Sequence, residues 1–381
     1  MNKITAFALA AALMLMFCSC SGSIGENPSE TEYTAQSMSV QSTATQSAAE
    51  EVNYEQAYAE KLEEVYKIVL RSAEKDDTLY DEEHEDLTGI LESCRYSDML
   101  DKIGYLIKDI NEDGVSELIL AVNEEGEYNP GSRILNMFTL KEGETVSVLE
   151  GWYRNSWYML KNGKFFNCGS GGAAYLINAV YGFSEETQLK CEDIYFTAPG
   201  VNGEESLRFL HNPDGLEDEN NEASVEITEE EFNRFQESCC ENEITLDLTP
   251  VSRIGFPEIK VGFLDDAETV PDDFETYTTE EAEGAVKLLF TSDEEIKSLT
   301  LCSMAVEGID EDGNLSYSVK SLKTFSRLKK PLVAEVIFYG DLPNNAFSIT
   351  DKFGNEIYFA VNLSGEDGSV QTYRIYNPRV E

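Results

Sequence analysis

The chain has 381 residues, and 73 acidic against 28 basic side chains give it a formal net charge of −45. Because 41% of the residues are hydrophobic and 10% are aromatic, there is enough apolar material for a folded core, which excludes wholesale disorder. So acidic a chain has no basic surface to replace the counterions on phosphates, which excludes nucleic acid as a default partner. With only two histidines, a histidine-based zinc site or catalytic triad is disfavoured.

The first residues have the pattern of an export signal. Lys3 precedes an apolar run from Ile4 to Phe17, which is shorter than the roughly 20 residues that a membrane-spanning helix needs. A small residue followed by a cysteine, Ser19-Cys20, ends the run. This stretch resembles the lipobox of bacterial lipoproteins, in which cleavage before the cysteine leaves a thiol that receives a diacylglycerol. The resemblance implies a signal peptide over residues 1–19 and lipidation at Cys20.

Two alternatives to this assignment stay open. Cys18 is a second candidate acceptor, but Phe17 would then precede the cleavage point, where a small side chain is preferred. The other alternative is a plain secretory signal in which the cysteines are incidental. A lipid on either cysteine predicts a protein anchored on the extracytoplasmic face of the cell membrane.

Residues 20–52 are predicted to carry the lipid and to form a flexible tether. They are rich in Ser, Thr, Gln and Glu and contain no Lys or Arg. A lipid, a polar tether and a folded body together form the layout of an extracytoplasmic surface protein. Six further cysteines follow without C-x-x-C spacing, so zinc and thioredoxin-like sites have no support, and the disulfide state stays open.

Periodicity predicts an α+β, β-rich chain whose first domain spans residues 53–254. Apolar residues at steps of three and four predict a helix over 54–74. Alternating apolar runs separated by turn residues then predict an antiparallel β-meander. A second helical stretch is expected around residues 86–100. A further helix is expected from Thr228 to Glu241, because Thr228 and Glu231 have the spacing of a capping box.

The remainder of the chain is predicted to form a second domain. Residues 255–278 are acidic and contain proline, which favours a linker. A short helix is expected from Thr279, which offers a cap that acidic residues follow. Beyond it, six or so short strands with turns between them predict a small β-sandwich within residues 279–381.

One motif in the first domain carries metal chemistry. Alternate residues of a tight loop point inward, so oxygen-bearing side chains at every second position converge on one point. The sequence places such side chains, and one backbone carbonyl, at Asp109, Asn111, Asp113, Val115 and Glu117. Gly114 permits the sharp turn between them. This pattern predicts a Ca²⁺ site.

The motif resembles the loops of EF-hand relatives, dockerins and FG-GAP repeats. It departs from the EF-hand and dockerin pattern at Leu120, where those families carry an acidic ligand. Because the flanking residues have strand character, the FG-GAP type of loop is the nearest. The alternative is a polar β-turn in which Asp and Asn side chains bond to their own backbone, and it stays open.

Both tryptophans of the chain, Trp152 and Trp157, lie within six residues of each other beside two tyrosines. Aromatic side chains stacked on a sheet face are able to hold a sugar ring, so these two residues are candidates for ligand binding. The competing hypothesis is that they fill a core.

Taken together, the lipobox, the tether, the calcium-type loop and the strand-rich C-terminus resemble the surface lipoproteins of Gram-positive bacteria. The resemblance implies a membrane-anchored, extracytoplasmic, non-enzymatic binding or scaffold module with a structural Ca²⁺. Its expected partners are the membrane, through the lipid, and a cell-wall or extracellular glycan or protein. The alternatives are a glycan-binding lipoprotein that uses Trp152 and Trp157, and a hydrolase that uses paired carboxylates.

Overall fold

The computed structural model describes residues 52–82, 84–95, 98–123, 131–172, 175–184, 188–200, 206–267, 271–279, 283–309, 315–340 and 342–381. The predicted signal peptide, both candidate lipidation cysteines and the tether up to residue 51 lie outside these residues. In the described part, strands dominate and almost all of their pairings are antiparallel, which confirms a β-rich chain built on antiparallel sheets.

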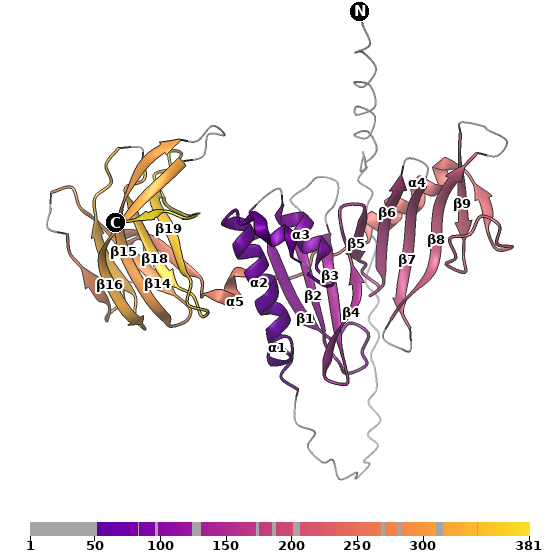
Figure 1. Cartoon of the computed structure of the whole chain (residues 1–381), viewed down its shortest axis with the longest axis horizontal. Helices are drawn as coiled ribbons and strands as arrows, with labels where there is room; N and C mark the ends of the chain where they lie inside the picture. The colour runs from indigo at the N-terminus through magenta and orange to yellow at the C-terminus, as the bar shows by residue number, and fades with distance from the viewer. Residues whose placement is uncertain are drawn as a thin grey trace, which may run out of the picture.

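The first half of the chain builds an eleven-stranded sheet (Figure 1). Its order is β10-β9-β8-β7-β6-β5-β3-β2-β1-β11, and β4 pairs with β3 outside this path. Most neighbours in the sheet are neighbours in the sequence, which is the definition of a meander. The strands are β1 (Ile103–Lys108), β2 (Glu117–Asn123), β3 (Ser132–Lys141), β4 (Glu144–Glu150), β5 (Asn155–Met159), β6 (Phe165–Gly172), β7 (Tyr175–Phe183), β8 (Leu189–Pro199), β9 (Leu207–Asn212), β10 (Val225–Ile227) and β11 (Thr249–Pro250).

Helices cover two regions of this sheet. Figure 1 shows α2 and α3 beside β1 to β3, and α4 beside the far strands, where it contacts β8 and β9. The helix α4 begins after the predicted cap, and Thr228 and Glu231 form the reciprocal capping box, so this prediction is confirmed. The helices are α1 (Tyr54–Ala57), α2 (Ala59–Ala73), the 3₁₀ turn η1 (Asp77–Asp81), α3 (Thr88–Cys94), α4 (Glu229–Glu241) and α5 (Ser252–Gly255).

Strand β2 is buried on both faces, and this explains its uninterrupted apolar sequence. Leu118 and Leu120 face the core shared with α2, whereas Ile119 and Ala121 face a second core that includes Leu246. A strand covered on both sides has no polar face. Packing on both faces of β2 therefore fixes the position of the β1–β2 hairpin, and with it the position of the loop at its end.

The second half of the chain builds two smaller sheets. The four-stranded sheet has the order β12-β14-β17-β13, and the six-stranded sheet has the order β20-β19-β18-β15-β16-β21. Phe290 of β14 meets Phe347 of β18 edge-on at 5.4 Å between ring centroids, so the two sheets face each other. The strands are β12 (Ile259–Phe263), β13 (Glu275–Tyr277), β14 (Val286–Ser292), β15 (Ile296–Ile309), β16 (Leu315–Leu328), β17 (Leu332–Val336), β18 (Asn345–Thr350), β19 (Glu356–Leu363), β20 (Val370–Ile375) and β21 (Arg379–Val380); the 3₁₀ turn η3 (Leu264–Asp266) follows β12.

Two segments differ in local structure from their sequence patterns. Residues 255–278, predicted as a linker, contain β12 and β13, which pair with β14 and β17. The helix expected from Thr279 is wrong over Val286–Ser292, which forms β14. Leu288 and Phe290 are buried there in the core of the sheets, and this burial outweighs the helical propensity of the acidic run before them.

A buried joint connects α2 to the second half of the chain. The Tyr66 hydroxyl donates to Asp351 Oδ2 at 2.8 Å, although the two residues are 285 positions apart. Asp351 is almost fully buried, and its carboxylate also accepts the backbone N–H groups of Phe353 and Asn355 and the Asn355 side-chain amide. Burial, and then the bond to Asp351, raise the pKa of Tyr66, so it remains a neutral donor.

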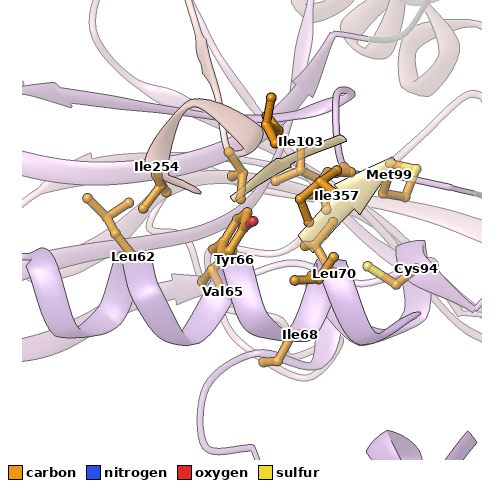
Figure 2. Packing of buried hydrophobic residues seen from close by; sticks show 14 of the residues in the cluster. Leu62, Val65, Tyr66, Ile68, Leu70, Cys94, Met99, Ile103, Ile254 and Ile357 are labelled. Carbon is orange, nitrogen blue, oxygen red and sulfur yellow. The ribbon is translucent and has the colours of Figure 1, made fainter. Parts of the chain in front are cut away.

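The joint is also sterically tight. Figure 2 shows Tyr66 directed from α2 into a cluster that includes Ile254 and Ile357. A Cβ added to Gly255 would come within 2.3 Å of the Tyr66 ring. The carbonyl of Gly255 also accepts the Lys352 N–H at 2.8 Å. Glycine at this position therefore allows α2, α5 and the turn after β18 to meet.

Replacing Tyr66 with phenylalanine tests the joint. The variant keeps the ring packing but removes one donor from a buried carboxylate, so we expect a loss of about 1–3 kcal/mol in the free energy of unfolding. Tyr153→Phe is the matched control, because the Tyr153 side chain is 86% exposed and removing its hydroxyl should cost almost nothing. Urea denaturation measures both changes, and equal free energies for the two variants would contradict the role given to the joint.

Candidate functional site

The calcium-type loop joins β1 to β2 as a hairpin in which Lys108 pairs with Glu117. Both flanks are strands, as predicted. Glu112 and Gly114 have left-handed backbone conformations, with φ of 62° and 91°. Two tyrosines fix the loop from outside: Tyr54 donates to the Gly114 carbonyl and Tyr58 to the Ser116 carbonyl, each at 2.7 Å. The N-terminal helices therefore hold this hairpin end in place.

Within the loop, the acidic and amide side chains accept backbone hydrogen bonds. Asp109 Oδ2 accepts the N–H of Gly114 at 3.0 Å, and Asp113 Oδ1 accepts the N–H of Val115 at 2.8 Å. Asn111 Oδ1 accepts the Asp113 N–H at 3.2 Å, and its amide donates to Asp113 Oδ2 at 2.9 Å. These bonds are the ones a polar turn makes.

Two carboxylates of the loop are more deeply buried than a polar turn requires. Asp109 Oδ1 is buried and has no hydrogen-bond partner among the described residues. Glu117 is 0% exposed, and among the described residues its carboxylate accepts the Ile110 N–H at 2.9 Å and the Thr139 hydroxyl at 3.2 Å. Burial raises the pKa of Glu117, and the nearby charges of Asp113 and Asp109 raise it further. Within the described ranges, no lysine, arginine or histidine forms an ion pair with any of these three carboxylates.

The predicted ligands are thus brought to one hairpin end but are not closed around a single point. Over the part of the chain that the structure describes, no three His, Cys, Asp or Glu side chains are arranged to hold a metal ion. Glu117 turns toward Ile110 and Thr139, and Asp113 is engaged by Asn111 and Val115. An ion would have to replace the bond between the Asn111 amide and Asp113.

The two tryptophans occupy different environments. Trp157 of β5 is 9% exposed and packs in the core against Tyr181, with 4.8 Å between ring centroids. Trp152 is 39% exposed, and the neighbouring Tyr153 is far more exposed. The structure therefore places Trp157 in a core and only Trp152, with Tyr153, on the surface.

A third site has no signal in the sequence. A cleft of about 770 Å³ lies where the end of α2 and α3 meet β16 and β20. We call it the tyrosine cleft, because three tyrosines line it together with five charged side chains: Tyr317, Tyr373, Tyr376, Glu74, Lys75, Arg95, Asp98 and Arg374. These residues come from four separate segments of the sequence, so only the folded chain gathers them.

The comparisons with known proteins do not identify this chain. No protein-family model matches it, and no curated protein matches it. Among the described residues, no helix combines the length and apolar character that a membrane crossing requires.

The buried carboxylate of Glu117 predicts a pH dependence in the absence of added metal. Its folded pKa lies above the ordinary 4.5, so the folded state binds the proton more tightly than the unfolded state does. This contribution stabilises the protein at low pH and is lost as the pH rises through the folded pKa. Glu117→Gln removes the charge and keeps a group able to accept from Ile110.

We therefore expect Glu117→Gln to gain stability relative to the wild type as the pH rises from about 4.5 toward 7 in chelator. Glu142→Gln, on the exposed β3–β4 turn, is the control and should show no such trend. Free energies of unfolding at several pH values measure the difference. A difference between Glu117→Gln and the wild type that stays constant across this range would contradict the assignment.

Proposed function

We propose that this protein is a membrane-anchored, extracytoplasmic binding or scaffold module, non-enzymatic, with a structural Ca²⁺ in the β1–β2 hairpin. The observation that carries the calcium part is that Asp109 Oδ1 is buried without a hydrogen-bond partner among the described residues, while its charge acts on the buried carboxylate of Glu117. Three carboxylates near one another without a cation repel, and a divalent ion relieves this repulsion.

The donor set fits Ca²⁺ by its chemistry. Asp109, Asn111, Asp113, the Val115 carbonyl and Glu117 offer only hard oxygens, which calcium prefers over nitrogen or sulfur donors. The hydrogen bonds from Tyr54 and Tyr58 to carbonyls of the loop already fix its backbone. This also favours an ion site at these residues. When bound, the ion would neutralise the acidic hairpin end and stabilise the fold there.

The anchor and the two-domain organisation belong to the same proposal. We infer lipidation at Cys20, from the lipobox pattern, and a tether that separates the lipid from the folded part. We also infer a helix-and-meander domain followed by a β-sandwich. The separate hydrogen-bonded sheets support this division, and the Tyr66 joint means that the two parts share a core.

Glycan binding on the surface aromatics is the second candidate function. The exposure of Trp152 and Tyr153 favours it, whereas Trp157 would contribute only by supporting the sheet beneath them.

The anchor is tested by Cys20→Ala. Without a thiol to acylate, the protein should leave the membrane fraction or accumulate with its signal uncleaved, because acyl chains supply the membrane affinity. Metabolic fatty-acid labelling measures the modification, with Cys18→Ala as the matched control. Labelling that persists in Cys20→Ala and disappears in Cys18→Ala would assign the lipid to Cys18 instead.

The calcium site is tested by thermal and chemical unfolding with added ions. Extracellular calcium modules bind with Kd values of about 10⁻⁴–10⁻³ M, so 1 mM Ca²⁺ should add about 0.5–1.5 kcal/mol to the free energy of unfolding. Mg²⁺ should add less, since it demands a tighter octahedron and gives up water reluctantly. Asp113→Ala should abolish the difference between the two ions.

The control for this experiment is Asp367→Ala. Asp367 is also an exposed turn aspartate, and it accepts bonds from the backbone and the hydroxyl of Ser369. Its removal should leave the difference between Ca²⁺ and Mg²⁺ unchanged. If the ions only neutralise a chain of net charge −45, both ions should stabilise it equally, and the effect should persist in Asp113→Ala. That result would mean that the loop is a polar turn and not a calcium site.

A further inference from the structure

The tyrosine cleft has the size and position of a ligand site. Its volume of about 770 Å³ falls within the roughly 300–1,000 Å³ typical of small-molecule pockets, which form preferentially where domains meet. One wall comes from the end of α2 and from α3, and the other from β16 and β20. The hydrogen bond between the Tyr376 hydroxyl and the Asp98 carboxylate joins these walls.

One group in the cleft lacks its natural partner. Arg374 Nη1 is buried and has no hydrogen-bond partner among the described residues. The guanidinium lies over the Tyr376 ring, 5.1 Å from the ring centroid, and a guanidinium cannot lose its charge in a protein. Native structures rarely leave a buried donor unpaired. This one indicates that an acceptor, and preferably an anionic one, belongs beside it.

The charges that line the cleft set the charge of the ligand. Lys75, Arg95 and Arg374 contribute three positive charges, and Glu74 and Asp98 contribute two negative charges, so the lining is +1 (3 − 2). This local excess stands out in a chain of net charge −45. A monoanion neutralises it, whereas a dianion such as a phosphate ester would leave surplus negative charge.

The tyrosines supply a second kind of contact. Tyr373 is 40% exposed, and its side chain is hydrogen-bonded to that of Tyr317. Flat rings with polar tips suit a ligand that has an apolar C–H face and hydroxyl groups, which describes a sugar ring. Consecutive residues of a strand point to opposite faces. Both Tyr373 and Arg374 nevertheless line the cleft, because β20 is the edge strand of its sheet and a ligand at that edge lies within reach of both faces.

We infer that the tyrosine cleft binds a sugar that carries a carboxylate, with Arg374 pairing with the carboxylate and Tyr373 contacting the ring. The inference names a ligand class for the proposed binding role, and it does not need the calcium loop. A guanidinium binds a carboxylate through directed, charge-assisted hydrogen bonds, so an acidic sugar should be distinguished from its neutral counterpart.

Isothermal titration calorimetry on the full chain in detergent tests this site, with glucuronate, glucose and glucose 6-phosphate as probes. We expect glucuronate to bind at least tenfold more tightly than glucose and more tightly than glucose 6-phosphate. Arg374→Gln should weaken glucuronate binding at least tenfold. Arg374→Lys should fall between this variant and the wild type, because it keeps the charge and loses the planar fork. Arg234→Gln is the matched control, since Arg234 is an exposed residue of α4 that pairs with Glu230.

Tyr373→Ser provides a test that does not depend on the buried arginine. The ring is exposed, so the variant should fold normally and still bind glucuronate several-fold more weakly. The inference is overturned if the wild type does not bind glucuronate, if glucose 6-phosphate binds as tightly, or if Tyr373→Ser and a folded Arg374→Gln both bind normally. Repeating the titration in chelator and in Asp113→Ala separates the two proposals: glucuronate binding should persist in both, whereas the ion-dependent stabilisation should not.

Discussion

The hydrogen bond from Tyr66 to the buried carboxylate of Asp351 is the interaction on which the arrangement of this protein depends. Helix α2 lies in a core that includes residues of the eleven-stranded sheet and of the two smaller sheets, and Tyr66 connects it to the second half of the chain. A carboxylate removed from water is costly unless donors surround it, and Tyr66 supplies a donor to Asp351 from outside its own turn, whereas Phe353 and Asn355 donate from within that turn. Farther along the same helix, the Asn377 side chain donates to the Glu74 carbonyl and the Tyr376 hydroxyl bonds to Asp98, and these contacts join the two walls of the tyrosine cleft.

Tyrosines repeat this role at the candidate calcium loop. Tyr54 and Tyr58 extend from α1 and from the start of α2 to the carbonyls of Gly114 and Ser116. One helical segment therefore positions the acidic hairpin at one end and lines the cleft at the other. In both places a neutral hydroxyl meets backbone or carboxylate oxygens, which suits a chain with far more acidic than basic residues. The two proposed sites are distinct in chemistry, since one presents oxygens to a cation and the other presents a guanidinium to an anion.

The sequence could predict features that neighbouring residues determine. The capping box of Thr228 and Glu231 spans four residues, and the strands around the Asp109 loop follow from their own short apolar runs. The strand at Val286–Ser292 could not be predicted from the acidic run before it, because its conformation is decided by burial of Leu288 and Phe290 against distant strands. The tyrosine cleft could not be predicted from the sequence for the same reason, because Asp98 and Tyr376, which bond to each other there, are 278 residues apart. The burial of Trp157 also depends on a ring from another strand, that of Tyr181.

The most direct test of the calcium-stabilised module is a residue-resolved NMR titration with Ca²⁺. The amides of Gly114 and Val115 bond to the carboxylates of Asp109 and Asp113, so an ion held by these oxygens must change their resonances. The Asn355 amide, which bonds to the buried Asp351, provides an internal reference. The account predicts saturable shifts at Gly114 and Val115 with a midpoint at or below about 1 mM, and no shift at Asn355. Shifts that grow without saturating, or that spread evenly over the acidic surface, would contradict it.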